Sequence, residues 1–123
     1  MYESLTIIGN LGADPEMRYT PAGDAVTNFS VAVNARWTGS DGAPQERVTW
    51  YRIACWGKLA EACNQYLVKG RKVMVTAKRI AAEAYLDKEG KPRAALKVTA
   101  DAVKFLDSAA GQRSIGEAAE IPF

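Results

Sequence analysis

Aromatic and cationic side chains are interleaved along the middle of the 123-residue chain. Trp50, Arg52 and Trp56 lie on one short run of strand-forming residues, and Arg36 and Trp37 come just before a glycine-rich stretch. Unstacked bases bind flat aromatic rings, at about 1–3 kcal/mol per base, and the phosphates between them bind Lys and Arg. The types and spacing of these residues therefore predict a surface that can stack bases and neutralise phosphates.

Basic residues are concentrated in the same part of the chain, although the net charge is only +2. Residues 47–104 contain 13 Lys or Arg against five Asp or Glu, whereas residues 1–46 contain two against six. A segment this basic favours a polyanionic partner, although charge alone is also compatible with a solvated face. The residues that we expect to contact phosphates, from their position among the aromatic residues, are Arg36, Arg52, Lys58, Lys69, Arg71, Lys78 and Arg79.

The use of cysteine and histidine excludes several kinds of chemistry. The chain has no histidine, and its two cysteines, Cys55 and Cys63, are eight residues apart without a CxxC pair. This pattern excludes the common zinc-binding spacings and any acid–base or nucleophilic mechanism that depends on histidine. We therefore expect no metal, no cofactor and no enzymatic activity, and we expect both cysteines to be buried thiols.

The strands that must position these residues follow from hydrophobic periodicity. Strand character is strongest over residues 5–8, 26–35, 48–56, 71–86 and 93–105. In the third of these segments, alternation directs Ile53 and Cys55 to one face. The opposite face then carries Trp50, Arg52 and Trp56 in a row.

A short helix is expected between the third and fourth strand segments. Gly57 precedes an apolar stripe of helical period, and Gly70 follows it as the expected C′ residue. The stripe consists of Leu59, Ala62, Cys63, Tyr66 and Leu67. Turns are expected at residues 20–23 and 38–45, and a change in the parity of apolar residues predicts a β-bulge near residues 100–102.

Three strands, a helix and two further strands are the element order of an OB-fold. We therefore predict an all-β domain over residues 1–107, a five-stranded Greek-key barrel with one short helix between its third and fourth strands. Over residues 108–123, small and polar side chains dominate without periodicity, which predicts a flexible tail. The chain has no apolar run near the roughly 20 residues that span a bilayer and no signal-peptide pattern, so we expect it to stay where it is made.

The exposure of the tryptophans is open at this point, because each could instead anchor a core or an interface. Trp37 has the same parity as Phe29, so strict alternation would direct it into the core. Its position at the end of a strand, beside a glycine-rich loop, favours exposure instead.

Four segments resemble the bacterial single-stranded DNA-binding proteins, and together they extend over nearly the whole chain. They read IGNLGADPEMRY at 8–19, TWYR at 49–52, WGKLAE at 56–61 and EIPF at 120–123. The resemblance implies a homotetramer of OB-folds around which single-stranded DNA wraps. It also places Tyr51 near the subunit interface.

The resemblance assigns site residues by position. The aromatic quartet that stacks bases corresponds to Trp37, Trp50, Trp56 and Tyr85. The family usually has phenylalanine in place of Trp56 and tryptophan in place of Tyr85. The basic positions of the family correspond to Arg18, Arg52, Lys58 and Lys69. The strand before Tyr85 is often arginine-rich in the family, whereas here it reads AAEA at 81–84.

The end of the tail resembles a peptide that recruits other proteins. It consists of Glu120, Ile121, Pro122 and Phe123. The tail has only Glu117 and Glu120 where consecutive aspartates are common, and an end without function is the alternative. The implied function is to bind and protect single-stranded DNA, largely without sequence preference, in replication, recombination and repair. The implied partners are replication and repair proteins, and the implied location is the cytoplasm, in association with the nucleoid.

Two other functions are compatible with the same fold. An RNA-binding or primosome-type OB module would need polar partners for the 2′-hydroxyl near the aromatic residues. A nuclease would need clustered carboxylates to hold a metal ion. Four acidic residues are expected in loops without the spacing of a metal site, namely Asp14, Glu16, Asp24 and Asp41.

Overall fold

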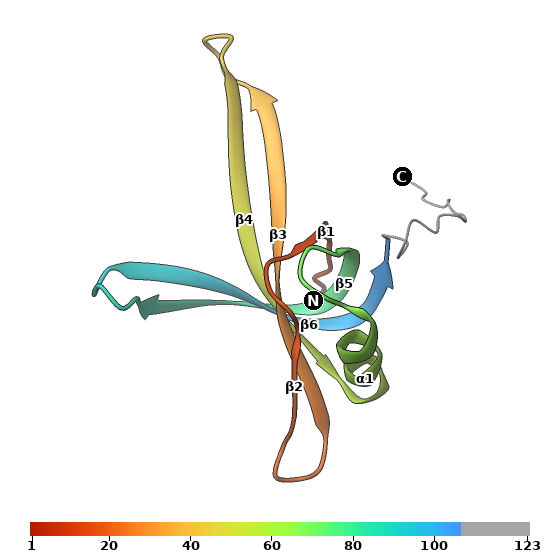
Figure 1. The fold of residues 1–123 in the computed structure, drawn as a ribbon. Helices are drawn as coiled ribbons and strands as arrows, with labels where there is room; N and C mark the ends of the chain where they lie inside the picture. The colour runs from red at the N-terminus through yellow and green to blue at the C-terminus, as the bar shows by residue number, and fades with distance from the viewer. Residues whose placement is uncertain (107–123) are drawn as a thin grey trace.

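Six strands and one helix follow one another in the computed structural model, which describes residues 1–106 (Figure 1). In chain order they are β1 (Leu5–Leu11), β2 (Glu16–Tyr19), β3 (Ala25–Thr38), β4 (Pro44–Trp56), α1 (Gly57–Tyr66), β5 (Lys72–Leu86) and β6 (Pro92–Phe105). The five strand segments and the helix that the sequence predicts are all present.

β1 closes the sheet into a barrel, because it pairs with β5 on one side and with β3 on the other. The barrel strands are therefore β1, β5, β6, β4 and β3 in spatial order. α1 connects the third and fourth of them along the chain, which confirms the OB-type barrel. The close approach of β1 to β3 requires a glycine. A Cβ at Gly9 would lie 2.8 Å from Val31 Cγ1 and would collide with the carbonyl oxygen of Ala32.

The short strand β2 is an element that the sequence does not predict. It pairs with β3 at the edge of the sheet, and three of its four residues are exposed. A strand of this length without a buried face has no alternation that could reveal it. The turn expected at residues 20–23 is confirmed, because Gly23 has a φ of 90° and its N–H donates to the Thr20 carbonyl at 2.8 Å.

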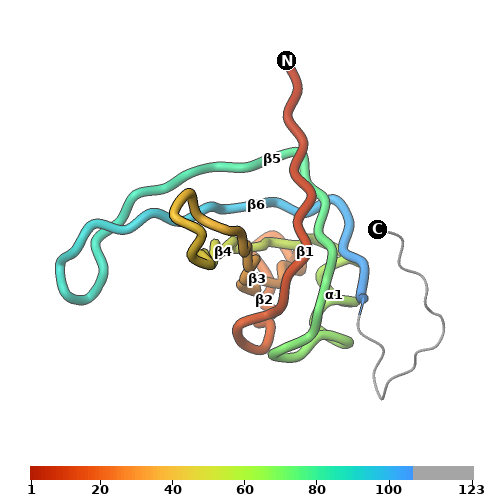
Figure 2. The backbone as a smooth tube through the Cα atoms, turned by 90° about the horizontal axis from the view of Figure 1, so that it is seen from above, coloured from red at the N-terminus to blue at the C-terminus, as the bar shows by residue number. Residues whose placement is uncertain are grey.

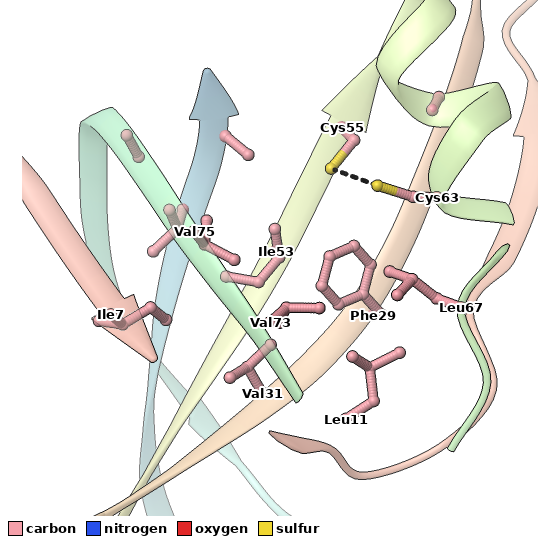
Figure 3. Packing of buried hydrophobic residues seen from close by; sticks show 14 of the residues in the cluster. Ile7, Leu11, Phe29, Val31, Ile53, Cys55, Cys63, Leu67, Val73 and Val75 are labelled. Atoms are coloured by element: carbon pink, nitrogen blue, oxygen red, sulfur yellow. Dashed lines mark hydrogen bonds between the residues drawn. The ribbon is translucent and has the colours of Figure 1, made fainter. Parts of the chain in front are cut away.

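Alternate residues of the barrel strands fill the interior together with one face of α1 (Figure 3). The largest fully buried apolar side chains of the strands are Val31, Ile53, Val73, Val75 and Val98. Thr27 is a buried polar residue within this core, and its hydroxyl donates to the Ala60 carbonyl at 2.6 Å. Because a buried hydroxyl without a partner is costly, this bond fixes α1 against β3.

The end of α1 differs from the prediction. The helix ends at Tyr66 with Leu67 as its C-cap, so Gly70, with a φ of 90°, belongs to the following turn and is not the C′ residue. Tyr66 is 54% exposed, and its ring centroid lies 6.1 Å from that of Phe105. The other residues of the expected stripe are buried or half-buried. Within residues 1–106, no helix has the length and apolar character to cross a membrane.

Two hairpin arms extend from the barrel, one formed by β3 and β4 and the other by β5 and β6 (Figures 1 and 2). Residues 34–38 and 81–86 of these arms are exposed on both faces. The loop expected over residues 38–45 is shorter, because β3 extends to Thr38 and β4 begins at Pro44. The arms have no core, so their residues follow no hydrophobic period.

A β-bulge lies where the β5–β6 arm leaves the barrel, and it confirms the prediction near residues 100–102. Thr76 pairs with Ala102 and Ala77 with Ala100, so Asp101 has no partner in the ladder. A second irregularity between Ala77 and Arg79 skips Lys78. Bulges bend a strand pair and increase its twist, which suits the change of direction at this point.

Candidate nucleic-acid interface

The outer face of β4 presents the row that alternation predicts. Ile53 and Cys55 are buried, whereas Trp50, Arg52 and Trp56 are exposed. Trp50 keeps 53% of its surface accessible and Trp56 keeps 47%. The two tryptophans are six positions apart along the strand, or about 20 Å at ~3.3 Å per residue. The strand thus carries two separate surfaces on which a base can stack.

Tyr85 lies beside Trp50 in a shallow groove that Arg52 and Arg93 also line. The Arg52 guanidinium carbon is 5.2 Å from the centroid of the Tyr85 ring, and its Nη2 is 3.5 Å from the Tyr85 hydroxyl oxygen. This is a cation–π arrangement. It joins the barrel to the β5–β6 arm and brings two of the four predicted stacking residues into one cluster.

Trp37 is on the β3–β4 arm and is 46% exposed. It is therefore exposed, as its position at the end of the strand favours, and not buried as strict alternation would require. The Arg47 guanidinium carbon lies 5.5 Å from the centroid of its ring. Beside it, Arg36 Nε is 3.8 Å from Glu46 Oε2. Because the arm has no interior, a residue of either parity is exposed there.

A second groove runs over the part of β4 that separates Trp50 from Trp56. Three strands contribute a cation to its wall, Arg18 from β2, Arg52 from β4 and Lys97 from β6. The remaining polar residues of the wall are Asp14, Glu16, Asn28, Ser30 and Thr99. The groove therefore offers hydrogen-bonding groups and positive charge between two aromatic surfaces.

The predicted basic residues fall into two groups. Arg18 and Arg52 share the groove on β4, and Arg36 accompanies Trp37 on the arm. The others lie outside these grooves, at Lys58 on the first turn of α1, Lys69 and Arg71 before β5, and Lys78 and Arg79 at the β5 irregularity.

Several hydrogen bonds to neighbouring elements hold the segment between α1 and β5 in place. The Lys69 backbone N–H donates to the groove residue Asp14, at Oδ1, across 2.8 Å, and Lys69 itself is exposed. Arg71 Nη1 donates to the Tyr66 carbonyl at 3.3 Å. The guanidinium of Arg71 thus already binds the end of α1.

Three cations near the aromatic residues were not among the predicted site residues, namely Arg47, Arg93 and Lys97. Lys97 is the direct β6 partner of Arg52 in the parallel pairing of β6 with β4. Its parity opposite to the buried Val98 indicates exposure, but the pairing of distant strands is not visible in the local sequence. Lys97 Nζ is 2.8 Å from Glu83 Oε1 on β5.

The two cysteines are buried free thiols, as expected. A hydrogen bond joins Cys55 Sγ on β4 and Cys63 Sγ on α1 across 3.8 Å (Figure 3). This hydrogen bond and burial raise the pKa of the Cys55 thiol. In the part of the chain that the structure describes, no three His, Cys, Asp or Glu side chains come together as a metal site. Glu16, expected in a loop, is the first residue of β2.

The predicted recruiting peptide, residues 120–123, and the tail to which it belongs lie outside the described residues.

The sequence matches the model of the Single-strand binding protein family over residues 2–106. It is 44% identical over 100 residues to a single-stranded DNA-binding protein of Neisseria meningitidis serogroup A, a match that covers 81% of this chain and 57% of that protein. It is 36% identical over 108 residues to a single-stranded DNA-binding protein of Wolinella succinogenes, covering 88% of this chain and 66% of that protein. The chain thus spans less than two thirds of the length of these relatives.

Among solved structures, the fold is similar to that of the Plasmodium falciparum SSB in complex with single-stranded DNA. The TM-score is 0.74 at 23% identity, and the match covers 87% of this chain and 97% of the other. At this identity the similarity concerns the fold, and it agrees with the barrel topology described above.

Proposed function

Because this chain belongs to the single-strand binding protein family, we propose that it binds and protects single-stranded DNA, largely without sequence preference. Residues 1–107 form the DNA-binding domain in this proposal, and binding involves no enzymatic step. The proposal is supported most directly by the outer face of β4, where exposed indoles lie on both sides of a groove with three cations.

Bases stack on the aromatic residues, and the phosphates between them contact Lys and Arg. The stacking residues are Trp37, Trp50, Trp56 and Tyr85. The phosphate contacts are Arg18, Arg36, Arg52, Lys58, Lys69, Arg71, Lys78 and Arg79. A duplex cannot use this surface in the same way, because its bases are already stacked on one another.

Tryptophan fluorescence tests the proposal directly. Oligo-dT should quench the emission strongly at moderate salt, whereas duplex DNA of equal charge should barely change it, because only unpaired bases reach the indoles. Equal quenching by both ligands would contradict the proposal. Competition by poly-rU as effective as that by poly-dT would favour an RNA ligand instead.

The resemblance in sequence also supports a homotetramer, since one small barrel contacts few nucleotides and wrapping requires several. Light scattering at micromolar concentration measures this, and a monomer there would contradict it. We further propose a role in replication, recombination and repair in the cytoplasm, at the nucleoid. In this proposal the tail over residues 108–123 recruits partner proteins through Glu120, Ile121, Pro122 and Phe123.

A further inference from the structure

Lys97 has the position of a phosphate ligand. It lies in register with Arg52 on the adjacent strand and lines the same groove as Arg18. The side chain keeps 49% of its surface exposed, so the ammonium is accessible from the groove. A phosphate that enters between Trp50 and Trp56 would therefore meet a third cation beside the two already predicted.

That ammonium already has a partner within the protein. Glu83 Oε1 on β5 lies 2.8 Å from Lys97 Nζ. The hydrogen bond from Lys97 and its charge, together with the charge of Arg52, lower the pKa of the Glu83 carboxyl. A carboxylate that stays ionised is thus placed among the cations of the groove.

This ion pair contributes little to the stability of the fold. Both side chains are about half exposed, at 49% for Lys97 and 54% for Glu83, and exposed pairs of this kind contribute little to the free energy of folding. Its effect on a bound phosphate is larger, because a carboxylate oxygen and a phosphate oxygen compete for the same ammonium.

We propose that Lys97 is a phosphate-binding residue and that Glu83 is its internal counter-ion, which single-stranded DNA must displace. The inference rests on the proposed function and adds a residue that limits affinity. When DNA binds here, a phosphate replaces the Glu83 carboxylate as the partner of Lys97. The net release of counter-ions is therefore smaller than for binding to a lysine that has no partner in the protein.

The test is the substitution Glu83→Gln, which keeps the shape of the side chain and removes its charge. Oligo-dT should bind about two- to fivefold more tightly at low salt, the range expected for one exposed ion pair. The slope of log K against log salt should become steeper by about 0.7, as for one more phosphate contact on a single strand. Glu89→Gln on the same hairpin is the matched control, since no cation contacts the Glu89 carboxylate within residues 1–106. It should leave both quantities near the wild-type values.

Lys97→Ala in the two backgrounds completes the test. The loss of affinity should be small in the wild type, where Glu83 occupies the lysine, and severalfold larger in Glu83→Gln. Equal losses in both backgrounds, or an unchanged salt slope in Glu83→Gln, would overturn the inference while wild-type binding stands. If the wild type itself fails to bind oligo-dT, the proposed function fails as well.

Discussion

The six-membered ring of Trp50 lies directly against the backbone of Gly12. A Cβ at position 12 would be 2.6 Å from Cζ3 and 2.8 Å from Cη2 of the indole. The Gly12 N–H donates to the Ser30 carbonyl at 3.0 Å, which holds this backbone at the start of the turn after β1. The absence of a side chain at Gly12 thus allows the Trp50 indole to pack directly on this backbone.

Gly12→Ala should therefore displace the indole of Trp50 and weaken binding of oligo-dT severalfold, with less quenching at saturation. The barrel should remain folded, because no backbone strain at position 12 opposes an alanine and the indole lies on the surface. Fluorescence titration and thermal melting measure the two effects. Trp50→Ala is the reference, and the two losses should not add, since both act through one ring. Additive losses would place the effect of Gly12 elsewhere.

Tyr85→Ala should lower the affinity for oligo-dT by about 1–3 kcal/mol, the value of one stacked base. Tyr85→Phe should bind with nearly the affinity of the wild type. The cation–π contact with Arg52 needs only the ring, and the contact from Arg52 Nη2 to the hydroxyl oxygen is long, at 3.5 Å. Isothermal titration of both variants separates ring from hydroxyl. A Tyr85→Phe variant as weak as Tyr85→Ala would show that the hydroxyl is the functional group.

The turn between β5 and β6 should depend on the ionisation of Asp87. Its carboxylate accepts the backbone N–H groups of Glu89 and Lys91 and the Nε–H of Arg93, each at 2.9 Å. The bond from Arg93 is the main cause of the lowered pKa of this carboxyl, and the backbone bond from Lys91 adds to it. A lowered pKa means that the stabilisation is complete above the ordinary value of 3.8 and is lost as the pH falls through the lower folded value.

Amide exchange of Glu89 and Lys91 should therefore remain slow relative to the unstructured rate until the pH drops below about 3.8, and then lose its protection. Asp87→Ala should lose the same protection at neutral pH while the barrel amides keep theirs. Protection of these amides that is unaffected by the substitution would show that the turn forms without the carboxylate.

Deletion of residues 120–123 should leave the affinity for DNA at high salt nearly unchanged and abolish capture of replication or repair proteins from lysate. Apolar side chains at an exposed terminus make physical sense if a partner desolvates them and pairs with the terminal carboxylate. Deletion of residues 109–112 removes the same length of tail and should leave capture intact. Capture by the protein without residues 120–123 would exclude them as the recruiting element.

The sequence predicts the barrel and its β4 face well because both depend on burial. The buried Ile53 and Cys55 determine on which side Trp50 and Arg52 lie, and alternation records this directly. Where burial is absent, the prediction fails or stays open. Alternation directs Trp37 to the wrong side, because the arm has two exposed faces.

Contacts between distant segments could not be predicted either. The pairing of Lys97 with Arg52 arises from two strands that run in parallel although 45 positions separate these residues in the chain. The contact between Gly12 and Trp50 depends on how the turn after β1 crosses the barrel. Such relations are properties of the closed sheet, and no local pattern encodes them.

The proposed stacking residues differ in how rigidly the fold holds them. Trp50 and Trp56 flank the part of β4, residues 51–54, that is paired with β3 on one side and with β6 on the other, so their backbone is attached to the closed barrel. Trp37 belongs to a two-stranded ribbon without a core, which can bend and twist at low cost in free energy. A DNA strand that stacks on the barrel tryptophans and on Trp37 would have a fixed position at the barrel and an adjustable direction beyond it. One protein could then bind DNA paths of different curvature.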